Sequence, residues 1–386
     1  MDREIAEKIY CSIPHKRRAE WVRLLTSYPE LTSTFLDSLL RGYTFARTNV
    51  ISEVITALDD GTNPDSMTLF IRPEFSESQI HEIRLGLKTL SESDVKLYAK
   101  VEIPDWRMKI IRELLESGIE TEKVEIYLNF NHNAYCLKEV ELAIRHNLDV
   151  KQIKYIAKPE YSGQQMKEIR LAFENGLSFK QVHFFAKAMF EPKEMRVLRE
   201  TLEAGDIDLD LFEMVARLCF DAMQMKEIID GIKLGFNKEQ LSKFALPNLS
   251  IFQMQLIKQA LLKGYNDEII TLISNPTIPL VRINLIYNAI FLYNMSAEKI
   301  EFIASNVFVE EDKMEILVDA MNFGVSLNDV KLISKYDIET LKSVVNAIKC
   351  GITLSSIFEV EEMHLDIIDY INAEIGKKLR NLLYNY

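Results

Sequence analysis

The chain has 386 residues, of which 48% are hydrophobic and 27% are charged, a composition typical of globular proteins. Its 58 acidic residues outnumber the 46 basic ones, and the net charge of −12 argues against a protein that coats nucleic acid or an anionic membrane by bulk charge. The four cysteines form no CxxC pair, no apolar run is long enough to cross a membrane, and the amino terminus lacks a signal-peptide core. We therefore expect a reduced, cytoplasmic protein with no membrane partner.

In chain order, three regions are predicted. Residues 1–49 fit no repeat and are predicted to form irregular helices that cap one end. Residues 50–364 consist of a repeated unit. Residues 365–386 are predicted to form a closing helix, which ends in the basic amphipathic stretch KKLRNLLYNY.

The repeated unit is about 29 residues long and occurs eleven times. Its clearest copies are IHEIRLGLKTL from Ile80, MKIIRELLESGI from Met108 and MKEIRLAFENGL from Met166. We number each copy from its first residue, position 0. These first residues are Ile51, Ile80, Met108, Leu137, Met166, Met195, Met225, Met254, Ile283, Met314 and Leu341.

Four columns of the repeat predict a helical hairpin. Positions +3 and +7 are apolar in every copy and share one face of a helix with position 0. Position +6 is small in ten of the eleven copies, which predicts a close approach by a neighbouring helix. Position +10 is glycine in eight copies and Asn147 in a ninth, as expected where a helix ends in a left-handed residue. A second, shorter amphipathic segment follows in each copy. The prediction is all-α: an α-solenoid of about eleven stacked helical hairpins with helical caps at both ends.

The phrase QMKEIRLAFENGL, from Gln165 to Leu177, resembles the QMxEIRxGLxxGL-type repeats of uncharacterised helical-repeat proteins from Gram-positive gut bacteria and their mobile elements. The resemblance covers about Ile51 to Ile357. It implies a repeat architecture and a mobile-element setting, and it carries over no catalytic residue.

No motif for catalysis or cofactor binding is found. Most of the thirteen glycines belong to the repeat, so neither GxGxxG nor a P-loop is present, and HExxH and GxSxG are absent. His132, Cys136 and His146 match no standard zinc spacing, and the methionines at position 0 are interpreted as core. We expect no enzyme activity, no cofactor and no metal.

One set of charged residues stands out. Cations recur at positions +1 and +4 of the repeat, and both positions are predicted to point away from the core. The candidate binding residues are Lys109, Arg112, Lys138, Lys167, Arg170, Arg196, Arg199 and Lys226. They are compatible with a solvated face, a surface for an acidic protein, or a nucleic-acid surface, although glutamates at position +2 dilute the positive charge.

The carboxyl-terminal copies instead carry apolar residues at the outer positions, namely Leu285, Tyr287 and Val318. Such a face is either covered by the last helix or forms an interface. The predicted function is a non-enzymatic scaffold that presents an extended surface to a protein partner. In the mobile-element setting, this chain would be a mobile-element protein that acts on a host factor. The alternative is a nucleic-acid-binding solenoid that uses the cations above, which the net charge disfavours.

Overall fold

The computed structural model describes residues 11, 13, 18–43, 50–205, 207–217, 219–306, 309–363 and 366–384. These residues form 24 α-helices and one short 3₁₀ helix, η2, and they contain no strand. The all-α prediction is confirmed. None of the described helices is both long and apolar enough to cross a membrane. The chain divides into two compact units, Met1–Pro192 and Lys193–Tyr386, which are described separately.

The helices of the first unit are α2 (Arg18–Ser27), α3 (Ser33–Tyr43), α4 (Val50–Asp59), η2 (Ser66–Leu69), α5 (Glu77–Thr89), α6 (Glu92–Tyr98), α7 (Asp105–Glu116), α8 (Thr121–Asn129), α9 (Ala134–Arg145), α10 (Val150–Ile156), α11 (Gly163–Glu174) and α12 (Phe179–Phe185). Helix α13 (Pro192–Ala204) begins at the boundary. The second unit continues with α14 (Leu209–Val215), α15 (Ala222–Lys233), α16 (Lys238–Phe244), α17 (Ile251–Leu262), α18 (Asp267–Ile273), α19 (Leu280–Phe291), α20 (Ala297–Ser305), α21 (Glu311–Phe323), α22 (Leu327–Ile333), α23 (Ile338–Lys349), α24 (Leu354–Glu362) and α25 (Ile367–Tyr384).

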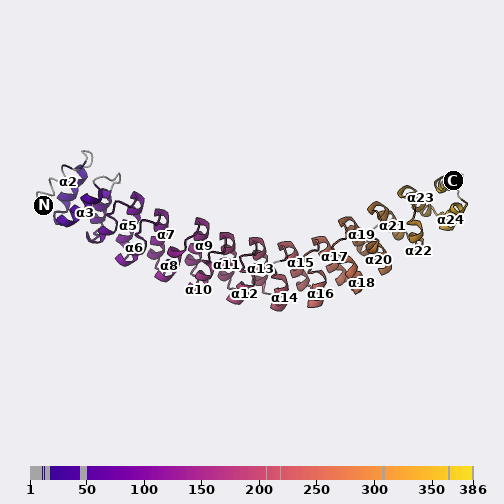
Figure 1. Ribbon diagram of the computed structural model, residues 1–386, viewed down its shortest axis with the longest axis horizontal. Coiled ribbons are helices and arrows are strands. Elements are labelled where there is room, and N and C mark those ends of the chain that lie inside the picture. Colours follow the sequence, from indigo (N-terminus) through magenta and orange to yellow (C-terminus); the bar gives the residue numbers. More distant parts are fainter. Residues whose placement is uncertain are drawn as a thin grey trace. The chain divides into compact units, whose positions relative to one another are not determined.

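From α5 to α24, a longer helix alternates with a shorter one. The odd-numbered helices of this stretch, together with α4, contain the repeat positions 0 to +7 and are here called first helices; the even-numbered helices from α6 on are the second helices. Within each unit, the helix pairs with the most extensive contacts lie one or two elements apart along the chain. In the first unit α5, α7, α9 and α11 lie along one side and α6, α8, α10 and α12 along the other (Figure 1). Helices this short are held mainly by such packing rather than by their own propensity.

The predicted glycine stops are confirmed. All eight glycines at position +10 have positive φ, for example 84° at Gly176, and Asn147 has a φ of 59°. Each lies one or two residues past the end of the helix that contains positions 0 to +7. At Gly176 the amide donates to the carbonyl of Phe173, and the next amide, of Leu177, donates to that of Ala172. These bonds satisfy the last carbonyls of α11 and turn the chain toward α12.

The small column at position +6 is buried where the two helices of a hairpin meet. Ala172 is fully buried, as are most of the equivalent alanines. A Cβ added at Gly86 would lie 1.8 Å from the hydroxyl of Tyr98 on α6, and one added at Gly231 would lie 2.6 Å from the Phe244 ring on α16. The predicted close approach is therefore confirmed, and the neighbour is the second helix of the same hairpin.

In six of the hairpins the residue at position −1 ties the two ends of the hairpin together. In α11, Gln165 accepts a hydrogen bond from the amide of the N-cap residue Ser162, and its amide nitrogen donates to the carbonyls of Ala188 and Phe190 beyond α12. Gln79, Gln224 and Gln253 repeat this arrangement. Where the residue is Arg107 or Arg282, the guanidinium donates to three carbonyls at the end of the second helix. Since these polar groups are buried, their pairing fixes the loop that leads to the next hairpin.

At the carboxyl-terminal end, α25 packs against α23 and α24, consistent with the predicted closing helix. At the amino-terminal end α2 and α3 are described, whereas residues 1–10, most of 12–17 and 44–49 of the predicted cap lie outside the described residues.

Candidate binding surface

The first helices expose one stripe of side chains between two flanks. Relative to position 0, position +4 is rotated by about 40° and position +2 by about 160° in the opposite sense. These two positions therefore lie on opposite flanks, each facing a neighbouring first helix. Positions −2, +1, +5 and +8 project between the flanks. We call these four positions the outward stripe.

The prediction that the cations at position +4 point into solvent is wrong. Arg170 is only 5% exposed and Arg199 only 7%, and the Arg112 side chain is 11% exposed. In the first unit these cations lie on the flank that contacts the preceding first helix, where a carboxylate meets them.

Buried ion pairs join position +2 of one first helix to position +4 of the next. Arg112 Nε lies 2.9 Å from Glu82 Oε2, and Arg170 Nε lies 2.9 Å from Glu139 Oε2. Arg84 binds Glu53 in the same way. In the second unit Lys258 Nζ lies 2.5 Å from Glu227 Oε2. The glutamates at +2, interpreted from the sequence as diluting a surface charge, are instead the buried partners of the +4 cations.

The arginines also bind a carboxylate four residues further along their own helix. Arg112 Nη1 lies 2.7 Å from Glu116, and Arg170 Nη1 lies 2.7 Å from Glu174. Burial disfavours the charge of Arg170, but the two carboxylates outweigh it and raise the pKa of the guanidinium. These arginines are thus bound on both sides by carboxylates of the chain, and they are poorly placed to bind a partner.

The sequence contained a signal for these pairs. The paired residues are separated by 30 or 31 residues, one repeat plus the offset between +2 and +4. Where +2 is apolar in the carboxyl-terminal copies, +4 of the next copy is apolar as well: Leu285 is followed by Val318, and both are buried. Comparing adjacent copies, rather than each column alone, would have found this coupling.

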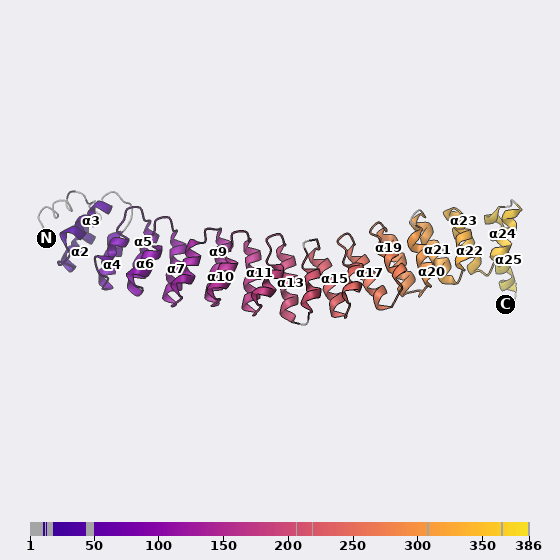
Figure 2. The ribbon, with the colours of Figure 1, turned by 60° about the horizontal axis from the view of Figure 1, so that its bottom comes forward.

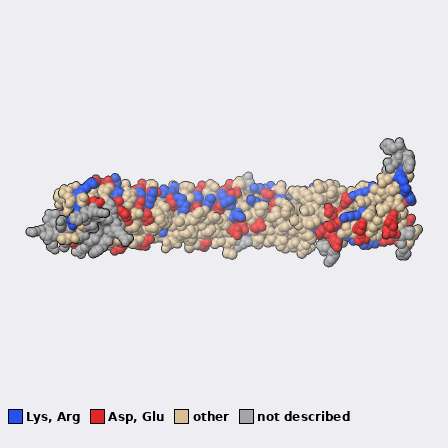
Figure 3. Space-filling model, turned by 90° about the horizontal axis from the view of Figure 1, so that it is seen from above, with Lys and Arg blue, Asp and Glu red and all other residues tan. Residues whose placement is uncertain are grey.

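The cations at position +1 lie on the outward stripe. Lys109 and Lys138 in the first unit and Arg196 and Lys226 in the second are exposed, whereas Lys167 is half-buried. Lys138 Nζ lies 3.1 Å from the carboxylate of Glu141. Figure 3 shows basic and acidic side chains intermixed over α7, α9 and α11 rather than one continuous positive surface.

A different surface lies in the second unit, where α15, α17 and α19 run side by side (Figures 1 and 2). An open groove with a volume of about 660 Å³ crosses their outward face. Phe252, Leu256, Gln255 and Gln259 of α17 line it together with Ile283, Asn284, Tyr287 and Phe291 of α19, and Glu227, Asp230 and Lys258 close the α15 end.

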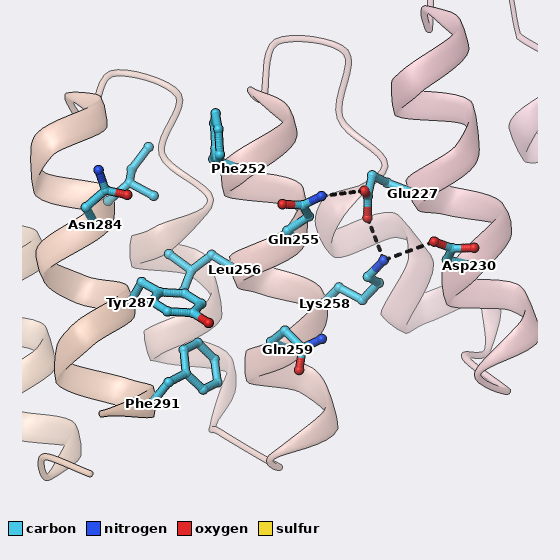
Figure 4. A pocket seen from close by; sticks show the side chains of 11 residues that line it. Glu227, Asp230, Phe252, Gln255, Leu256, Lys258, Gln259, Asn284, Tyr287 and Phe291 are labelled. Carbon is cyan, nitrogen blue, oxygen red and sulfur yellow. Dashed lines mark hydrogen bonds and ion pairs between the residues drawn. The ribbon is translucent and has the colours of Figure 1, made fainter. Parts of the chain in front are cut away.

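The groove has an apolar side and a polar end (Figure 4). The rings of Tyr287 and Phe291 lie 4.6 Å apart and face the groove from α19. At the other end Glu227 binds both Lys258 and the amide nitrogen of Gln255, the latter at 2.7 Å. Lys258 also lies 3.6 Å from Asp230, whose side chain is 56% exposed.

The two helices α17 and α19 present no exposed charged side chain to the groove, although Lys263, just past α17, lies over the Phe291 ring. Helices α17 and α19 contain two charged residues between them, Lys258 at 7% exposure and the fully buried Arg282. Their outward stripes consist instead of Phe252, Gln255, Gln259 and Leu262 on α17 and of Val281, Asn284, Asn288 and Phe291 on α19. Phe252 is 58% exposed and Val281 54%. Of the apolar outer positions singled out in the sequence, Tyr287 is 47% exposed, whereas Leu285 and Val318 are core residues.

The candidate metal ligands do not converge. Cys136 is buried, and burial raises the pKa of its thiol. His132 stacks on the Phe130 ring, and His146 lies 2.8 Å from Glu174. In the described part of the chain, no three His, Cys, Asp or Glu side chains gather as a metal site would require.

No family model matches the chain, and no curated protein matches its sequence.

Proposed function

We propose that the chain is a non-enzymatic binding scaffold, built as an α-solenoid of about eleven hairpins, which presents an extended surface to a protein partner. The contacts within each unit support this architecture, because they join helices one or two elements apart. The hydrogen bonds of the glutamines at position −1 support it too, since they recur in several hairpins.

The observation that carries the proposal is the exposed apolar surface over α17 and α19. Phe252, Leu280, Val281, Tyr287 and Leu292 are each between 47% and 67% exposed. In Figure 3 a charge-poor area lies over these helices. Contiguous apolar surface on a water-exposed face is typical of a site that a protein partner covers.

The support for nucleic acid is weaker. Of the candidate cations, those at position +1 other than the half-buried Lys167 are exposed, whereas those at +4 are buried against carboxylates. Acidic side chains lie among the accessible cations, so the counterion release that drives binding to phosphate backbones would be small. The mobile-element setting, with a host factor as partner, is supported by the resemblance of the repeat alone.

Affinity capture with the full chain, from cells of the native host, tests the proposal. We compare wild type with Tyr287→Ser/Phe252→Ser and with Lys109→Glu/Lys138→Glu/Lys226→Glu, each with and without nuclease treatment. Leu332→Ser on α22 is a matched control, since Leu332 is 52% exposed on a second helix.

The proposal predicts partners that are lost with the apolar double variant and retained with the charge-reversed variant, with the control and after nuclease treatment. Capture that survives the apolar double variant, or that depends on nucleic acid and on the three lysines, would refute it.

A further inference from the structure

The groove over α17 and α19 contains features of a site for one particular shape of partner. We propose that it binds an extended polypeptide segment, with apolar residues of the segment over α17 and α19 and basic residues over α21. This inference rests on the proposed function and specifies the partner's conformation and charge.

The first argument concerns the side-chain amides. Gln255 and Gln259 occupy positions +1 and +5 of α17, and Asn284 and Asn288 occupy the same positions of α19. Gln259 and Asn284 are exposed, and their side chains make no hydrogen bond within the described part of the chain. The Gln255 amide nitrogen donates to Glu227, which directs this side chain from α17 toward α15 and leaves its amide oxygen free to accept (Figure 4).

An amide offers one donor group and one acceptor, the complement of a backbone peptide unit. Neighbouring first helices lie about 8–10 Å apart, and an extended chain advances about 3.3 Å per residue. Amides on α17 and α19 therefore face backbone groups about three residues apart on a segment that crosses the helices. A bound helix would leave these amides unused, because its own backbone groups are already paired.

The second argument concerns the apolar contacts. Tyr287 and Phe291 form one side of the groove, and Phe252 projects beside its entrance (Figure 4). Leu256, beside Tyr287 in the lining, is 1% exposed and contributes to the floor. Alternate side chains of an extended segment point to one side, so every second residue can pack against these rings.

The third argument concerns charge. Next to α19, the outward stripe of α21 carries Asp312, Glu315 and Asp319, all exposed, while Lys313 is half-buried. Asp319 binds Lys349, which leaves Asp312 and Glu315 as exposed carboxylates without an ion pair in the described chain. At the other end, Lys258 neutralises Glu227, whereas Asp230 is more exposed. Lys263, just past the end of α17, lies 4.4 Å from the Phe291 ring and is an exposed cation at the Phe291 end of the groove. Beyond α19 the surface becomes acidic at α21, which favours basic residues on that side of the segment.

The test uses the full chain and a displayed library of random 12-residue peptides as the probe. We expect the enriched peptides to carry apolar residues at alternate positions, followed within about six residues by Lys or Arg. The best peptides are then synthesised with a fluorophore, and their Kd is measured by anisotropy.

Asn284→Ala and Gln259→Ala should each weaken binding about three- to tenfold, the effect of losing a hydrogen bond of ordinary strength. Glu315→Lys should weaken the basic peptides further. Asn346→Ala is the matched control: Asn346 occupies position +5 of α23, is exposed, and should leave the Kd within about twofold. N-methylation of a single peptide amide facing the groove should weaken binding, as it removes one backbone donor.

The inference is overturned if no enriched peptide responds to Asn284→Ala. It is also overturned if the bound peptides become helical by circular dichroism and tolerate N-methylation. A third overturning result is a dimer of this chain that Tyr287→Ser dissociates, since the occupant is then a second copy. If the bound peptides are helical but Tyr287→Ser/Phe252→Ser still abolishes capture of a protein partner, the scaffold proposal is retained and only the extended conformation of the partner is rejected.

Discussion

The buried ion pair between α9 and α11 makes a sharp prediction about stability. Arg170 and Glu139 are each about 5% exposed, and the bond between Nε and Oε2 is 2.9 Å long. At an effective dielectric constant of about 20, charges about 4 Å apart attract by about 4 kcal/mol, a gain offset by the cost of removing both groups from water. Removing one partner therefore leaves a buried charge whose desolvation is no longer compensated.

We expect Arg170→Met to destabilise this region by about 3–5 kcal/mol, because Glu139 then lacks its cation. Glu139→Leu should cost about 3 kcal/mol, the low end of that range, because Glu174 still binds Arg170. The double variant Glu139→Leu/Arg170→Met should lose less than either single variant, since apolar replacement of a whole buried pair is often neutral. The chain supports this expectation, because Leu285 and Val318 occupy the same two repeat positions in α19 and α21.

Urea denaturation followed by circular dichroism measures the overall loss, and amide hydrogen exchange of α9 and α11 localises it. Exchange is needed because arrays of repeats open locally. Lys109→Met, at an exposed position of α7 with no ion pair in the described chain, is the control and should cost less than about 0.5 kcal/mol. Single variants no worse than this control, or a double variant that loses the sum of the single losses, would refute the coupling.

Three further predictions concern the hairpin itself, each measured as a shift in the denaturation midpoint. Gly176→Ala should cost about 1 kcal/mol, because its φ is 84° and the space around an added Cβ is open, so that backbone strain is the whole effect; an unchanged midpoint would contradict this. Ala172→Leu should cost about 1–3 kcal/mol by overpacking the contact between α11 and α12, and a neutral result would mean that the packing yields easily. Gln165→Ala should cost about 1–3 kcal/mol, since it leaves the carbonyls of Ala188 and Phe190 without this donor. Its exposed neighbour Gln164, replaced in the same way, should have almost no effect.

The hairpin was predictable from the sequence because its determinants are local and recur. The residue ten positions after position 0 is left-handed in the eight copies where it is glycine and in the copy where it is asparagine, as Gly176 and Asn147 show. The residue at +6 has to be small because the second helix of the same hairpin packs directly against it, as at the fully buried Ala172. The helix class, the stops and the close contacts therefore followed from residues within one repeat.

The roles of the charged residues depend on contacts between adjacent repeats, and these contacts cannot be seen when one repeat position is considered alone. Arg170 is a charged residue with an i,i+4 partner, Glu174, as is usual on an exposed helix face. It is nevertheless buried, because Glu139 of the neighbouring helix α9 binds it. Lys138, next to Glu139 in the chain, remains exposed because no neighbouring helix packs against the outward stripe of α9. The groove of α17 and α19 likewise arises only when two helices without exposed charge lie side by side. Periodicity decides which face of a helix is apolar, whereas the packing of neighbouring helices decides which polar flanks remain exposed to water.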